Sequence, residues 1–403
     1  MLAVGTSVVI GGCGGSSGHV STARTTTATR SVSAGSLPGP GCSTAVASAP
    51  ALAGARTAFV RVSGLPFGVA VTRDGRWSFV DELPDHVELF SDVGFAPRAV
   101  RSIGVPEEAA GSSLTRDGRY LLVADGSYGA TVVSVSRAEA GAHNAVLGTL
   151  RRPGRGGSRG GAIEVTSSPD GRYAFVSVEN DDAVAVYDLH AALASRFRSS
   201  AYLGSVALGR AVVGEAVSPD GRWLYATSEI AAGARATDHT QGTLSVISLA
   251  KAERDPARSV IATVPAHCQP VRVAVSADGR TVWVTARASD QLLAFSATRL
   301  ISDPSHALLA AVRVGEAPVG LALTSGDQRV VVADSNRFNA SGAHSDLTVV
   351  SAPAALAGRS AILGTIPAGS FPREMALEPN GDTLLVGNFA SKQLEAVAVG
   401  DLR

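Results

Sequence analysis

A ten-residue phrase recurs along this chain, and it constrains the fold more than any other feature of the sequence. In each copy a glycine beside an aspartate or asparagine separates two apolar runs, as in SSPDGRYAFV at residues 167–176. Repetition at a regular period indicates that one supersecondary unit is built several times. The seven copies begin 43 to 58 residues apart and occupy residues 71–80, 114–123, 167–176, 217–226, 275–284, 323–332 and 377–386.

Each copy is predicted to be a β-hairpin, because Asp-Gly and Asn-Gly steps tolerate the positive φ angles of tight turns. The run before the turn alternates as a strand does, as at residues 271–275, and so does the run after it, as at 281–284. Four antiparallel strands per roughly 50 residues, repeated, are typical of β-propeller blades. Third strands are predicted at 130–136, 183–189, 244–250, 347–353 and 394–400, and fourth strands at 98–105, 145–152, 202–209, 259–266, 308–315 and 361–369.

The two ends of the repeated region predict how the ring closes. The last unit has three strands before the chain ends at Arg403, whereas residues 57–71 match residues 308–323, a fourth strand that runs into a first strand. We therefore expect residues 57–62 to complete the seventh blade of an all-β, seven-bladed β-propeller with four-stranded antiparallel blades. Closure removes exposed sheet edges. An open solenoid or a two-domain arrangement would leave this strand unpaired.

The charge balance argues against nucleic acid as a partner. Lys plus Arg and Asp plus Glu number 35 each, so the chain lacks the basic excess that such partners require. After the N-terminus no segment has the ~18 consecutive apolar residues of a membrane-spanning helix. We expect a monomer whose contact with a membrane, if any, is through a lipid anchor.

The N-terminal segment carries the export prediction. Residues 1–12 are apolar and small, and Ile10-Gly11-Gly12-Cys13 resembles a bacterial lipoprotein box, although the apolar stretch is short and lacks a preceding basic residue. We expect an extracytoplasmic protein that is lipidated at Cys13 or secreted; the alternative is an unstructured leader with an incidental cysteine. The predicted organisation is a signal-like segment at 1–13, a flexible Gly/Ser/Thr/Ala-rich tether at 14–56 and the propeller at 57–403.

The spacing of the cysteines and histidines predicts no metal or cofactor site. There is no CxxC, CxxCH, HxH or HExxH spacing among the three cysteines and eight histidines, so neither a metal nor a haem is expected. If Cys13 is lipidated, Cys42 and Cys268 remain as an even pair that an oxidising compartment would join as a disulfide between tether and ring. The alternative is a free, buried Cys268.

The hairpin geometry predicts where a ligand would bind. The start of the first strand lies beside the end of the second, at the end of the blade opposite the Asp-Gly turn, and the first strand is nearest the axis. At the aligned position six residues before the turn, four blades have glycine and three have a charge. The candidate ligand-binding residues at this mouth are Glu164, Glu179, Glu215, Glu229, Arg272, Arg287, Asn336, Arg337, Arg373, Glu374 and Asn388.

Two interpretations of these charges stay open. They pair with one another around a water-filled channel and hold the blades together, as buried charges usually do. Alternatively they bind a small polar ligand, with arginine recognising carboxylate or phosphate oxygens. A catalytic version needs a general acid or base with a shifted pKa, for which Glu164, Glu179 and His267 are the candidates.

The repeat phrase also points to a family. Residues 270–279 (PVRVAVSADG), with residues 318–324 and 372–381, match the pattern P-x-x-hydrophobic-A-V-S-P-D-G, so residues 57–403 resemble the YVTN-type β-propeller repeat family. This resemblance implies an exported propeller of the kind found among surface-layer-associated proteins and lactonase-like enzymes. The main hypothesis is a module that binds a ligand or an envelope protein. The alternative is a lactonase-like hydrolase with a Glu/Arg site at the channel mouth; a redox propeller is disfavoured.

Overall fold

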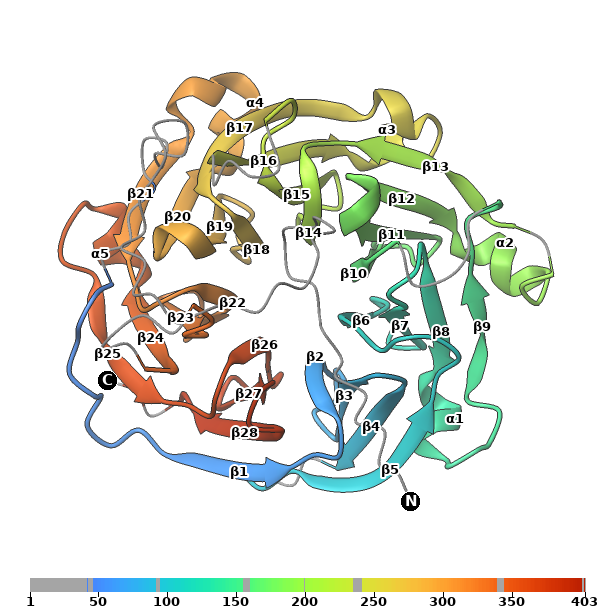
Figure 1. Ribbon diagram of the computed structural model, residues 1–403, viewed down its shortest axis with the longest axis horizontal. Coiled ribbons are helices and arrows are strands. Elements are labelled where there is room, and N and C mark those ends of the chain that lie inside the picture. Colours follow the sequence, from blue (N-terminus) through green and yellow to red (C-terminus); the bar gives the residue numbers. More distant parts are fainter. Residues whose placement is uncertain are drawn as a thin grey trace, which may run out of the picture.

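The computed structural model describes residues 42, 46–91, 95–154, 160–198, 200–234, 241–338, 344–400 and 402. The segment 1–13 with Cys13, and all of the predicted tether except residues 42 and 46–56, lie outside the described residues. The described chain forms seven four-stranded antiparallel sheets arranged around a central axis (Figure 1). The predicted fold class is therefore confirmed.

In each blade the first strand lies nearest the axis and the fourth lies at the outer rim (Figure 1). Blades 1 to 6 each use four strands in chain order, and blade 7 takes its outer strand from the N-terminal side of the chain. The strands are, by blade, β2 (Leu65–Val71), β3 (Trp77–Leu83), β4 (His86–Ser91) and β5 (Arg98–Gly104); β6 (Ser112–Leu114), β7 (Tyr120–Ala124), β8 (Ala130–Ser134) and β9 (Val146–Leu150); β10 (Ala162–Ser167), β11 (Tyr173–Val178), β12 (Ala183–Asp188) and β13 (Tyr202–Ala207); β14 (Arg210–Val217), β15 (Trp223–Ile230), β16 (Gln241–Ser248) and β17 (Val260–Cys268); β18 (Pro270–Val275), β19 (Thr281–Ala286), β20 (Gln291–Ser296) and β21 (Leu308–Arg313); β22 (Pro318–Thr324), β23 (Arg329–Asp334), β24 (Asp346–Ser351) and β25 (Ile362–Pro367); and β26 (Pro372–Leu377), β27 (Thr383–Asn388), β28 (Gln393–Ala398) and β1 (Thr57–Arg61).

The ring closes as the sequence predicts. β1 pairs antiparallel with β28, with Thr57 opposite Val397 and Arg61 opposite Gln393, and the blade 7 sheet has the order β1-β28-β27-β26. The strand spans residues 57–61, one residue shorter than predicted. Because β1 covers the outer edge of β28, strands from opposite ends of the chain form one sheet.

The repeated turn is stabilised by side chains as well as by backbone conformation. In blade 1, Asp74 Oδ1 accepts hydrogen bonds from Thr72 Oγ1 at 2.7 Å and from the Arg76 amide at 3.1 Å, and the Trp77 amide donates to Thr72 Oγ1 at 3.1 Å. Only Gly75 has positive φ, at +65°, so glycine alone supplies the left-handed residue and the aspartate acts through its side chain. Four other turns repeat the side-chain bond, namely Thr115–Asp117, Ser168–Asp170, Ser218–Asp220 and Ser276–Asp278.

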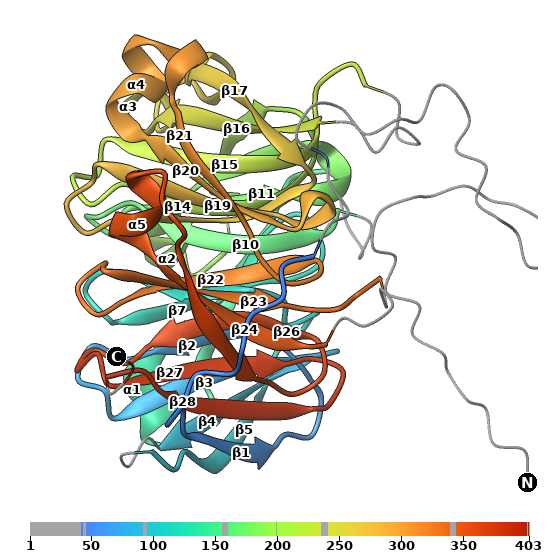
Figure 2. The same ribbon diagram turned by 90° about the vertical axis from the view of Figure 1, so that its left-hand side faces the viewer.

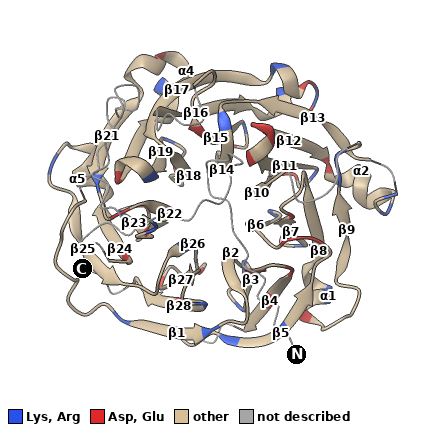
Figure 3. Cartoon of the chain, in the orientation of Figure 1, with Lys and Arg blue, Asp and Glu red and all other residues tan. Residues whose placement is uncertain are grey.

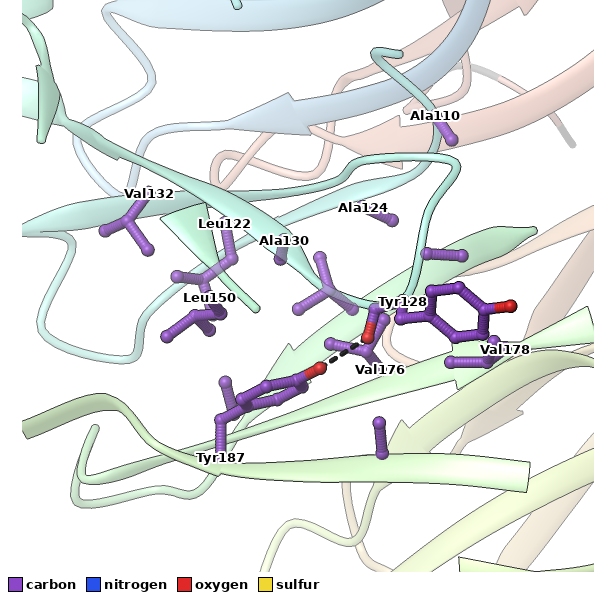
Figure 4. Packing of buried hydrophobic residues seen from close by; sticks show 14 of the residues in the cluster. Ala110, Leu122, Ala124, Tyr128, Ala130, Val132, Leu150, Val176, Val178 and Tyr187 are labelled. Carbon is purple, nitrogen blue, oxygen red and sulfur yellow. Dashed lines mark hydrogen bonds between the residues drawn. The ribbon is translucent and has the colours of Figure 1, made fainter. Parts of the chain in front are cut away.

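The hydrophobic core lies between blades rather than within a central body. Both faces of each sheet are covered by neighbouring blades, so strands such as β12 are buried along nearly their whole length. Figure 4 shows this packing between blades 2 and 3, where Leu122 and Leu150 lie close to Val176 and Tyr187. The Tyr187 hydroxyl donates a hydrogen bond to the Tyr128 carbonyl, which ties the two blades together.

Five short helices were not predicted. Each follows a third strand, and they gather on the face opposite the candidate mouth (Figure 2). In α2 the Asp188 side chain caps the helix by accepting from the Ala191 amide at 2.8 Å, while Leu189 and Ala192 are buried. Such short segments lack a helical period that sequence could reveal. They are α1 (Val135–Glu139), α2 (Leu189–Ala194), α3 (Leu249–Ala252), α4 (Ala297–Ser302) and α5 (Ala352–Leu356), with 3-10 turns η1 (Glu179–Asp181), η2 (Pro256–Arg258), η3 (Arg287–Ser289) and η4 (Pro304–His306).

Residues 46–56 lie along the outer rim of blade 6 before entering β1 (Figure 1). The Leu52 amide donates to the Thr365 carbonyl at 2.8 Å, and the Thr365 amide donates to the Pro50 carbonyl at 3.0 Å. Cys42 and Cys268 form a disulfide with a Cα–Cα distance of 5.4 Å. This part of the segment assigned to the tether is thus attached to the ring. No helix in the described residues is long and apolar enough to cross a bilayer.

Candidate functional site

An arginine at the axis holds two carboxylates from other blades. Arg272 on β18 lies with its Nη2 2.8 Å from Glu164 Oε1 of β10, and its Nε donates to Glu374 Oε1 of β26. Its Nη1 donates to the Val213 carbonyl at 2.8 Å. Because the first strands of all blades face the axis, residues separated by 102 positions in the chain meet here. The structure thus brings Glu164, Arg272 and Glu374 together at the axis.

The channel contains more carboxylates than this arginine can neutralise. Glu215 on β14 and Asp81 on β3 have no hydrogen-bond partner for either carboxylate oxygen. Burial, and then the charge of Glu164, raises the pKa of both groups well above the usual range. Burial also raises the pKa of Glu164 to about 8, although Arg272 opposes the shift. Burial thus favours the protonated forms of these carboxyl groups.

Asp81 is a channel residue that the sequence analysis missed. A Cβ at Gly68 would lie 2.1 Å from Asp81 Oδ2, so glycine in the first strand leaves space for a side chain from the second strand. Ser177, Thr227 and Thr285 occupy the equivalent position in their blades, and Thr285 Oγ1 donates to the Val319 carbonyl of the next blade at 2.6 Å. Ala124, Ala333 and Gly387 occupy it in the remaining blades, so alignment of the second strands would have revealed one carboxylate among small residues.

An aromatic cage surrounds Arg373 at the mouth. The guanidinium carbon lies 3.9 Å from the ring centroid of Phe67 and 5.5 Å from those of Phe371 and Phe389. Arg373 is 9% exposed, its Nε has no hydrogen-bond partner, and none of the ion pairs among the described residues includes it. The three phenylalanines lie at the start of a first strand or the end of a second strand. At these strand ends the sequence had predicted only charged and amide side chains as ligand-binding residues.

The electrostatic surroundings of Arg373 are positive. Burial, followed by the charges of Arg272, Arg337 and Arg287, lowers the pKa of Arg373 to about 9, while the charge of Glu374 opposes the shift. Arg337 also lies over Phe371, with its Cζ 5.8 Å from the ring centroid. A buried cation among like charges is costly, and the fold holds Arg373 here although no carboxylate of the described residues forms an ion pair with it.

Other predicted residues are engaged with neighbours outside this cluster. Glu229 Oε1 lies 2.7 Å from Arg287 Nη2 in a buried ion pair. His267 Nδ1 lies 2.6 Å from Gln291 Oε1, and the amide of Asn388 donates to Glu395 Oε2 at 2.7 Å in the interior of blade 7. These contacts position loops and strand ends, as the first interpretation of the charges expects.

Glu179 and Asn336 lie in loops that follow second strands, and their backbone amides are hydrogen-bonded. Glu179 opens η1, and its amide donates to the Gly161 carbonyl at 2.8 Å. Asn336 has φ of +48°, and its amide donates to the Glu316 carbonyl at 3.1 Å. Both residues therefore shape the loops after second strands. Figure 3 shows acidic and basic positions interspersed around the ring, so the chemistry of the mouth depends on which of them reach the axis.

The fold and the channel define a class of protein, a seven-bladed β-propeller with a charged axial mouth. The chain belongs to the family described as Lactonase, 7-bladed beta-propeller, whose profile matches residues 101–348. No curated protein matches the sequence. Among solved structures, Kuenenia stuttgartiensis hydrazine synthase is similar with a TM-score of 0.65 and 16% identity, over 85% of this chain and 98% of that one. The β-propeller domain of Cps50 (Swd1) from Myceliophteria thermophila has a TM-score of 0.60 and 13% identity, over 86% and 99%. At these identities the likeness concerns the fold alone.

Proposed function

We propose that the protein binds a small organic carboxylate at the channel mouth and that Arg373 is the anchoring cation. The observation that carries this proposal is the buried guanidinium of Arg373, which lies against Phe67 and has no carboxylate partner. Buried polar groups normally find partners, and a planar guanidinium suits the two oxygens of a carboxylate. A ligand would supply the partner that the chain does not.

The surroundings favour an organic anion over an inorganic one. A carboxylate entering the mouth would bring negative charge to a site where Arg272, Arg287 and Arg337 already lower the pKa of Arg373. The rings of Phe67, Phe371 and Phe389 provide apolar contact for the carbon skeleton attached to that carboxylate. Binding is therefore expected to raise the pKa of Arg373 towards its usual range.

Replacing Arg373 with methionine is expected to weaken carboxylate binding by about 10- to 100-fold, the usual loss for a charge-assisted hydrogen bond. Calorimetric titration with aliphatic and aromatic carboxylates, each paired with its primary amide, measures the effect. Arg280→Met is the matched control, because Arg280 is an exposed arginine at an Asp-Gly turn on the opposite face. Equal binding by Arg373→Met, or equal binding of acid and amide by the wild type, would contradict the proposal.

A second candidate function is lactone hydrolysis, which the family membership and the Glu164 carboxylate favour. In its ionised form Glu164 would take a proton from water as the water oxygen bonds to the lactone carbonyl carbon. The ring C–O bond then breaks, and the proton passes to the departing alkoxide, leaving a hydroxy acid. The carboxylate of that product matches the ligand proposed for Arg373.

If Glu164 is the base, kcat/KM for lactone hydrolysis is expected to rise with pH through about 8, because burial raises the pKa of Glu164 to that value and only the ionised form accepts a proton. Glu164→Gln is expected to lower kcat/KM by about 10²- to 10⁴-fold. Glu253→Gln, which alters a glutamate at the end of α3 on the outer rim, is the control. Carboxylate binding without turnover of any sugar or homoserine lactone, with or without divalent metal, would exclude hydrolysis and leave the binding role intact.

We also propose that the protein works outside the cytoplasm, bound to the envelope through a lipid on Cys13 or secreted. The Cys42–Cys268 disulfide supports this location, since structural disulfides belong to oxidising compartments. Fractionation of producing cells with alkylation of free thiols is the test. Recovery of the protein in the cytosol with both thiols reduced would contradict the proposal.

A further inference from the structure

Three side chains with metal-ligating atoms meet on blade 1, away from the channel. Glu82 at the end of β3 is opposite His86 of β4 in the strand register, and Glu88 follows His86 by two positions. All three therefore share one face of the sheet. One ligand atom from each lies within 4.8 Å of the others. The sequence showed no ligand motif because strand pairing, rather than spacing along the chain, brings them together.

The shared face packs against blade 7, where the ring closes. Val80 and Phe90 on this face contact Leu385 and Leu394 of blade 7. Ser63, in the link between β1 and β2, joins the polar end of the same seam. Its Oγ lies 2.9 Å from His86 Nε2 and 3.0 Å from Glu82 Oε2. The cluster thus connects blade 1 with residues 62–64, the link that follows the ring-closing strand β1.

Both nitrogens of the His86 ring lie near oxygen atoms. Nε2 lies 2.9 Å from Ser63 Oγ and 3.0 Å from Glu82 Oε2, which also accepts a hydrogen bond from the Gly64 amide. Nδ1 lies 3.6 Å from Oδ1 of the exposed Asp85. The Nε2 edge of the ring therefore faces the buried carboxylate of Glu82.

The burial of Glu82 is an independent observation that points to a cation. Its side chain is fully buried, and its Oε1 has no hydrogen-bond partner. Glu88 adds a second, partly buried carboxylate, with one ligand atom within 4.8 Å of those of Glu82 and His86. Two neighbouring carboxylates, one of them fully buried, need a compensating positive charge.

We propose that Glu82, His86 and Glu88 bind a divalent transition-metal ion, with Zn²⁺ as the representative, and that Ser63 supports the ligands by hydrogen bonding. One imidazole and two carboxylates suit Zn²⁺ and related ions, whereas Ca²⁺ and Mg²⁺ prefer oxygen ligands alone. Because Ser63 belongs to the link between β1 and β2, the bound metal stabilises the closed ring. This site is separate from the channel mouth and does not depend on the proposed carboxylate binding.

The test is zinc binding by tag-free, full-length protein. Bound metal is first removed with a chelator, and the chelator is then removed before zinc is added. Calorimetry and elemental analysis after desalting are expected to show one zinc per chain, and zinc is expected to raise the Tm. His86→Ala is expected to weaken zinc binding by about 100-fold or more, and Ser63→Ala by about 10-fold. His306→Ala is the matched control, since His306 contacts Asp303 at 3.0 Å on the exposed surface without a third ligand.

Several outcomes would contradict the proposed zinc site. Failure of the wild type to retain zinc, or zinc binding by His86→Ala equal to that of the wild type, overturns it. Ca²⁺ binding that exceeds Zn²⁺ binding and is insensitive to His86→Ala also overturns it, because the histidine would then have no role. If Glu82→Gln does not fold, His86→Ala and Glu88→Gln provide the measurement, and loss of zinc in both folded variants supports the site.

Discussion

Protein that begins at residue 65, and so lacks β1, is expected to lose the closed ring and to be far less stable than protein that begins at residue 56. The five-residue pairing of β1 with β28 disappears, and the cover that Ala58 and Val60 give to Leu394 and Ala396 is lost. Loss of about five ladder hydrogen bonds at about 1 kcal/mol each lowers the Tm by roughly 5–10 °C for a ring of this size. The exposed edge of β28 is also expected to promote aggregation.

Scanning calorimetry and light scattering of the two truncated proteins measure this effect. Both lack Cys42, so the disulfide is absent from both, and the comparison measures β1 together with the link at residues 62–64, in which Ser63 and Gly64 contact Glu82. A synthetic peptide with the sequence of residues 56–63 is expected to restore part of the lost stability by adding a strand to the open edge. Equal stability and equal solubility of the two proteins would show that the ring does not depend on this strand.

Arg272→Met is expected to destabilise the protein by about 3–5 kcal/mol above pH 8, because it leaves the carboxylates of Glu164 and Glu374 in the channel without their shared cation. The sign of the pH dependence follows from Glu164, whose pKa burial raises to about 8. As pH falls through this value Glu164 binds a proton and no longer needs the cation, so the loss of stability is expected to shrink. Urea unfolding at several pH values measures it.

A double-variant cycle with Glu164→Gln tests whether Arg272 stabilises the protein through its charge or through packing. Glu164→Gln removes one of the two unpaired charges, so in the Arg272→Met background it is expected to restore part of the lost stability. In the wild-type background the same change removes a partner of Arg272 while Glu374 remains. A loss of stability that is independent of pH, or unaffected by Glu164→Gln, would mean that Arg272 acts through packing rather than charge.

Much of the candidate site could be predicted because the turn repeats. Counting back from each turn aspartate locates the first-strand positions at the axis, and this count identified Glu164, Arg272 and Glu374. Arg373 was found as the neighbour of Glu374. Asp81 was missed because it reaches the channel from a second strand through the space left by Gly68. The phenylalanine cage was missed because aromatic residues near strand ends are also common in cores.

The sequence by itself determined the number of blades, most of their strands and the use of residues 57–62 to close the ring, since turn chemistry and strand alternation are local properties that each repeat carries. The third strands of blades 1 and 5, His86–Ser91 and Gln291–Ser296, were located only in the structure. Only the tertiary structure decided which charges pair. The ring brings Arg272 of blade 5 into contact with Glu164 of blade 3 and Glu374 of blade 7. It leaves the neighbouring Arg373 among phenylalanines. Likewise, strand pairing and the closing link together place Ser63, Glu82 and His86 at one point. Contacts between blades depend on the curvature of the whole ring, which no repeat contains alone.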